Sequence, residues 1–160
     1  MKKRWLFYLL AGILFGIFDF YFQVWINQLF PMGKLSSIAM LVPILGVWLV
    51  LVVPIALREV KVSRSAWLAA AASSFTWSVS VVAYYLFMGV KLILIGQASR
   101  SEMHISNRAD PYYWSNVRNF FVGDFWDGVS EWIIVALVGG SLIGLLVGFL
   151  ARGQKNNANM

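Results

Sequence analysis

Residues 35–57 read LSSIAMLVPILGVWLVLVVPIAL and contain no charged residue in 23 positions. A helix of about 20 mostly apolar residues crosses the hydrocarbon core of a bilayer. Lipid offers the backbone no hydrogen bonds, so only helices or closed barrels span it. Barrel strands are segments of about ten residues with alternating polarity, whereas this run is unbroken. The stretch therefore predicts a membrane-spanning helix.

Three further runs of the same kind occupy residues 5–30, 67–95 and 129–150, with Asp19, Lys91 and Glu131 as their only charges. Hydrophobic types make up 60% of the 160 residues and charged types 12%, against roughly 25% charged in a soluble domain. We therefore predict an all-α, polytopic membrane protein, in which residues 1–160 form a single domain of four transmembrane helices.

The distribution of basic residues predicts the orientation. Cytoplasmic loops carry an excess of Lys and Arg. With the N-terminus inside, eight basic residues lie on the inner side and four on the outer side. We expect a retained signal anchor at residues 5–30, cytoplasmic N- and C-termini, and the cell inner (plasma) membrane as the location. The net charge of +6 is then an insertion signal, and we expect no nucleic-acid partner.

The long outer loop at 97–128 is rich in aromatic residues. Asp110-Pro111 is a typical helix start, with an N-cap residue before a proline. The following residues place Tyr113, Trp114 and Val117 with Phe120, Phe121 and Phe125 on one broad helical face. We predict an amphipathic helix over 111–122 that lies in the outer membrane interface; a lid or a docking surface are alternatives. Residues 153–160 form a polar tail.

Small residues recur every four positions in two of the runs. Such spacing lets another backbone approach closely. One interpretation is packing within the chain, and the other is a seam for oligomerisation or for a larger membrane partner. The residues concerned are Gly12 and Gly16 in the first run, and Ala136, Gly140, Gly144 and Gly148 in the last.

Asp19, Gln23 and Asn27 follow one another at intervals of four, which places a polar stripe on an apolar helix. A carboxylate at membrane depth is costly, so Asp19 should be paired, protonated or turned towards protein or water. We expect Lys91 as its partner, with Glu131 as a competitor and Tyr84 nearby. These residues predict a structural polar cluster, a ligand or ion pocket, or a proton relay. A relay is disfavoured because the inner halves of the predicted spans carry no titratable group.

The sequence contains no nucleophile elbow, P-loop, zinc-protease motif or dinucleotide fingerprint, and it has no cysteine. We therefore expect no catalytic residue, metal or cofactor. Our first hypothesis is a non-catalytic integral subunit or accessory protein, which packs on other membrane helices through its glycine faces as a homo-oligomer or within a larger complex. A small-molecule or ion transporter component built around Asp19 is the alternative. A membrane-embedded enzyme that uses Asp19 or Glu131 as a base comes third.

Overall fold

The computed structural model describes residues 2–29, 37–95, 108–109 and 111–157, which form helices and short turns. The elements are α1 (Lys2–Leu29), α2 (Ser37–Ser63), α3 (Ala66–Ile95), α4 (Tyr113–Asn119), the π-helical turn η1 (Phe120–Asp124) and α5 (Phe125–Asn157). The all-α prediction is confirmed for this part of the chain. Within it, three stretches are long and apolar enough to cross a membrane: Lys3–Ile26, Ala66–Leu94 and Tyr113–Ala151. The span predicted at 35–57 includes residues outside the described part and stays a prediction.

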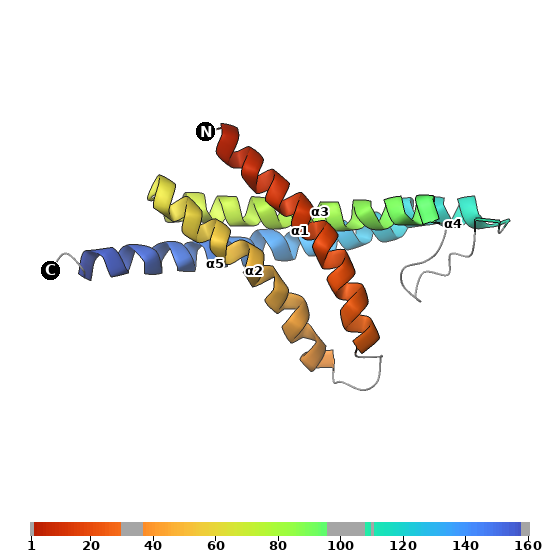
Figure 1. The fold of residues 1–160 in the computed structure, drawn as a ribbon, viewed down its shortest axis with the longest axis horizontal. Helices are drawn as coiled ribbons and strands as arrows, with labels where there is room; N and C mark the ends of the chain where they lie inside the picture. The colour runs from red at the N-terminus through yellow and green to blue at the C-terminus, as the bar shows by residue number, and fades with distance from the viewer. Residues whose placement is uncertain (1, 30–36, 96–107, 110, 158–160) are drawn as a thin grey trace.

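α3 and α5 form a long antiparallel pair, and the hairpin of α1 and α2 crosses this pair obliquely (Figure 1). α3 is the central helix, because it packs against α1, α2 and α5. The beginning of α1 and the end of α5 lie towards one end of the pair, and α4 lies at the opposite end (Figure 1). Large apolar side chains remain exposed along α1, α3 and α5, as expected for helices that face lipid.

Glycines allow α1 and α5 to lie directly on the backbone of α3. A Cβ atom at Gly12 would lie 2.7 Å from the carbonyl oxygen of Thr76, and one at Gly16 would overlap the next turn of α3. A Cβ atom at Gly144 would lie 2.5 Å from the Cα atom of Ala70. Backbone atoms of a packed helix cannot move aside as a flexible side chain can, so any larger residue would separate the helices. The same kind of contact is made by Gly140 with Ser74 and by Gly148 with Ala66.

These contacts bear on the first interpretation of the small-residue spacing, which is packing within the chain. Both glycine faces are used inside the chain, where they seat α1 and α5 on α3. The glycine faces thus pack within the chain, as the first interpretation predicted, and the packing of a partner on them stays a prediction.

The predicted amphipathic helix is the beginning of a much longer continuous helical segment, from Tyr113 to Asn157, which we call the rod. It starts at Tyr113, and its N-cap residue is Tyr112, which makes no side-chain capping bond; the predicted cap Asp110 lies outside the described residues. The helix then continues through η1 into α5. At 1.5 Å per residue, the rod from Tyr113 to Asn157 is about 68 Å long. Its location in a membrane interface stays a prediction.

The apolar face of this segment packs against the end of α3. Tyr113 is fully buried, and its hydroxyl donates to the carbonyl oxygens of Leu92 at 3.0 Å and Ile93 at 3.1 Å. The π-helical turn brings the rings of Phe120 and Phe121 onto Gly89 of α3. This packing is the reason why the segment follows α3 instead of forming a separate helix.

Candidate functional site

The polar stripe of Asp19 and Gln23 lies on the buried side of α1. Asp19 is 3% exposed and Gln23 is 8% exposed. The amide Nε2 of Gln23 donates to Oδ1 of Asp19 over 3.4 Å, a long hydrogen bond. Asp19 stands one turn beyond Gly16, where an added Cβ atom would meet backbone atoms of Ser80 and Tyr84 of α3. The structure therefore places both side chains in the region where α1 meets α3.

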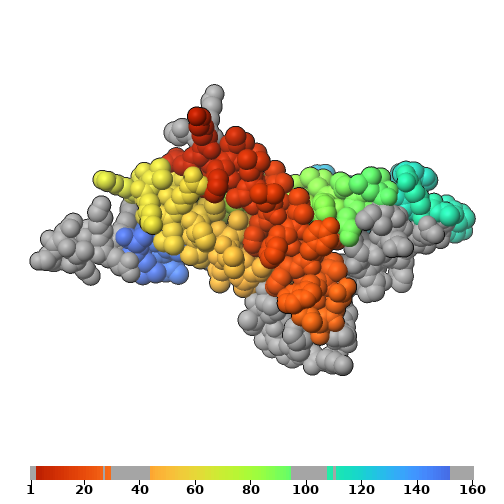
Figure 2. All heavy atoms as spheres, in the orientation of Figure 1, coloured from red at the N-terminus to blue at the C-terminus, as the bar shows by residue number. Residues whose placement is uncertain are grey.

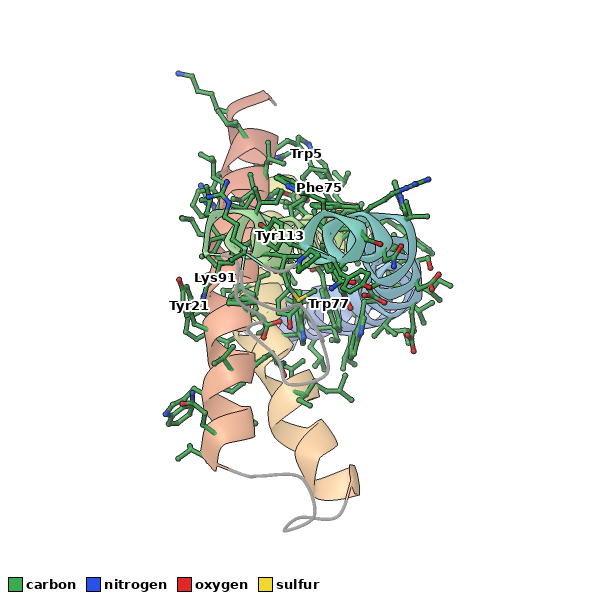
Figure 3. The ribbon with its side chains drawn as sticks, turned by 90° about the vertical axis from the view of Figure 1, so that its right-hand side faces the viewer. Trp5, Tyr21, Phe75, Trp77, Lys91 and Tyr113 are labelled. Atoms are coloured by element: carbon green, nitrogen blue, oxygen red, sulfur yellow. The ribbon has the colours of Figure 1, made fainter. Side chains whose placement is uncertain are left out.

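Lys91 reaches α1 from the C-terminal part of α3. Its Nζ lies 5.1 Å from the ring centroid of Phe20 and 5.3 Å from that of Tyr21, within the range of cation–π attraction. Lys91 and Tyr21 lie together beside α1 in Figure 3. Tyr84, also from α3, is buried, and its ring contacts Phe20 at 5.7 Å. Lys91 and Tyr84 thus surround the residue that follows Asp19, and the ion pair between Asp19 and Lys91 stays a prediction.

The other two residues of the predicted site differ in their positions. Glu131 is exposed on α5, and this helix packs mainly on α3 and α2. Val129 and Ala136 face the core, and a step of two residues from Val129 turns the helix by about 200°, which places Glu131 on the opposite face. Glu131 is therefore not part of the buried cluster. Asn27 lies on α1, but its side chain is outside the described part.

A second polar cluster lies where α1 begins and α2 ends, and the sequence did not predict it. Glu59 is fully buried. The hydroxyl of Tyr8 donates to its Oε2 atom over 2.6 Å, and the guanidinium of Arg4 lies 3.2 Å from its Oε1 atom. A buried ion pair is costly to break, because the remaining charge is left without compensation. The cluster therefore ties the first turns of α1 to the last turns of α2.

One sequence signal could have identified Glu59. It is the only acidic residue between Asp19 and Glu102, and basic residues surround it at 58, 61 and 64. The second predicted span ended two residues earlier, so Glu59 lay outside every predicted span. The end of the bundle where α1 begins and α2 ends therefore does contain a buried titratable group, which weakens one argument used against a relay.

The middle of α3 adds a polar face inside the bundle. The Ser74 hydroxyl lies 2.9 Å from the Ser141 hydroxyl and donates to the carbonyl oxygen of Leu137 over 3.1 Å, which links α3 to α5. Ser73 and Ser80 are fully buried, and the described residues offer their hydroxyl oxygens no hydrogen-bond partner. The interior thus holds polar groups with unused hydrogen-bonding capacity.

Comparisons of the chain with models of known families, with curated proteins and with solved structures give no match.

Proposed function

We propose that this chain is a non-catalytic, multi-pass subunit of a membrane complex, which docks onto its partner through the outer end of the α3–α5 pair. In this proposal four helices cross the inner (plasma) membrane, and both termini are cytoplasmic. The observation that carries the proposal is that the helix pair is longer than a bilayer is thick and ends in exposed aromatic side chains.

Two contacts between α5 and α3 serve as reference points for measuring length along the helix pair. Gly148 lies against the start of α3, and Gly128 lies against the ring of Tyr85. The helix from Gly128 to Gly148 rises about 30 Å, which is the thickness of the hydrocarbon core. Exposed tryptophans stand next to both reference points, Trp67 at the inner one and Trp126 at the outer one. Tryptophan is enriched at membrane–water interfaces, so this placement fits the proposed insertion.

Beyond Trp126 the rod continues for about 20 Å to Tyr113. Figure 2 shows the end of α3, together with α4, extending past α1. Tyr112, Trp114 and Val122 are each at least 65% exposed here; we call these three side chains the apolar head. A contiguous apolar patch outside the hydrocarbon core marks a contact site for another protein, and we propose that these side chains form one. The head replaces the glycine faces as the proposed partner surface.

Photo-crosslinking from two positions on the same rod tests the proposal. A photoreactive amino acid at Trp114 should yield an adduct whose mass reports either a second copy of this chain or another subunit. The control position is Val138, which is exposed in the membrane-spanning part of α5 and should yield lipid adducts. Lipid adducts at both positions, together with a monodisperse monomer by native mass spectrometry of gently solubilised membranes, would refute docking through the head.

A transporter component is a second candidate, because Asp19 and Gln23 are buried together and Ser80 has an unused hydroxyl nearby. A buried carboxylate in a membrane helix often marks an ion or substrate path. On this hypothesis Asp19→Asn removes uptake in proteoliposomes and leaves the unfolding temperature unchanged. Normal uptake with a lowered unfolding temperature would show that Asp19 is structural.

A further inference from the structure

The fold brings the basic ends of α1 and α2 together and separates their cations from the nearby acid. Lys3, Arg58 and Lys61 are exposed. The guanidinium of Arg58 lies 3.7 Å from the ring centroid of Phe7, which joins the two helices at this point. Lys3 stands one turn before Phe7 on α1, and Lys61 stands three residues after Arg58 on α2, so both belong to the faces that meet there. We call Lys3, Arg58 and Lys61 the basic rim.

Glu59 does not neutralise the basic rim. It points away from Arg58 into the interior, where it is fully buried and pairs with Arg4 and Tyr8. The described residues around the rim include no exposed acid, because Glu59 is the only acidic residue between Asp19 and Glu102. The rim therefore keeps a net positive charge and attracts anions at short range.

Arg58 is held in a geometry that suits a phosphate group. Stacking on Phe7 occupies one face of the planar guanidinium. The N–H groups lie in the plane of the guanidinium, so they remain able to bind two phosphate oxygens at once. An arginine that is already held in place also loses less conformational freedom when it binds.

The surface that continues from the rim towards the membrane centre is apolar. Leu6 and Leu10 on α1 and Leu57 on α2 are all exposed. Cations at one end and aliphatic side chains along the helices match a molecule with an anionic head and hydrocarbon tails. Clusters of Lys and Arg at the cytoplasmic end of membrane helices attract anionic lipids.

We infer that the inner ends of α1 and α2 bind an anionic phospholipid, whose phosphate lies on Arg58 between Lys3 and Lys61 and whose acyl chains lie along Leu6, Leu10 and Leu57. The inference rests on the proposed insertion with these ends at the cytoplasmic leaflet, but it requires no protein partner. A failure of the crosslinking experiment at Trp114 therefore leaves it intact.

Native mass spectrometry of the purified full chain in a neutral detergent tests the inference. With phosphatidylglycerol and phosphatidylcholine added separately, the wild type should retain phosphatidylglycerol preferentially. Arg58→Gln should weaken this retention about tenfold, and Phe7→Leu should weaken it less, because it removes the stacking platform but keeps the apolar surface. Arg118→Gln is the matched control, since Arg118 is an exposed cation on α4 at the opposite end.

Three results would overturn the inference. Equal retention of the two lipids would show that the head group is not recognised. Equal losses in Arg58→Gln and Arg118→Gln would show general charge attraction without a site. Displacement of the lipid by inorganic phosphate at a similar concentration would show that the rim binds free phosphate and that the acyl chains contribute nothing.

Discussion

Replacing Arg4 by glutamine would leave the Glu59 carboxylate fully buried, with the Tyr8 hydroxyl as its remaining partner among the described residues of α1. Removal of one member of a buried ion pair costs about 3–5 kcal/mol, because an uncompensated charge stays in a medium of low dielectric constant. The Arg4 side chain is 20% exposed, so water already screens part of the attraction. We therefore expect the lower end of that range, about 3 kcal/mol of unfolding free energy.

The double variant Arg4→Gln with Glu59→Gln provides the decisive comparison. It removes both charges, so it should recover most of the stability that Arg4→Gln loses. The two single changes should consequently be non-additive, as expected for residues in direct contact. Tyr8→Phe removes the 2.6 Å hydrogen bond to the carboxylate and should cost about 1.5–3 kcal/mol, the range for hydrogen bonds to charged groups.

Reversible unfolding in mixed micelles, with the denaturing detergent as titrant, measures these differences. Far-UV circular dichroism reports the loss of helix. Two results would refute the assignment of Arg4 and Glu59 as a coupled buried pair. One is an Arg4→Gln variant as stable as the wild type. The other is a double variant whose loss of stability equals the sum of the two single losses.

Three other predictions concern helix packing and are checked by the same unfolding titration. Gly144→Leu should lower stability by more than about 3 kcal/mol, because the new side chain meets the α3 backbone; Gly46→Leu, where a Cβ atom meets nothing within 4 Å, is the control, and equal losses would contradict the packing argument. Tyr113→Phe should cost about 1 kcal/mol and accelerate amide hydrogen exchange at the end of α3, and unchanged exchange would argue against its anchoring role. Ser74→Ala should cost roughly 0.6 kcal/mol, the average for an interhelical hydrogen bond in a membrane protein, and a stabilised variant would contradict the link to α5.

The position of Asp19 shows which features of the site a local sequence pattern can predict and which it cannot. Intervals of four residues were enough to predict that Asp19 and Gln23 share a face of one helix, because helix geometry depends only on neighbours along the chain. The same reasoning favoured Lys91 over Glu131 as the partner of Asp19, but it could not place either side chain in space. That placement depends on how α5 is rotated about its axis, and the rotation is set by the glycines and aromatic rings that meet α3.

Composition and run length by themselves determined that this chain is helical and that its long segments are apolar enough to cross a membrane, since both follow from each residue's own transfer free energy. Only the tertiary structure decided that the glycine faces of α1 and α5 are occupied by α3, that Tyr113 begins a rod continuous with α5, and that Glu59 is buried against Arg4. These features join residues that are distant in sequence, and the close packing of whole helices selects them from many pairings that local pattern allows equally.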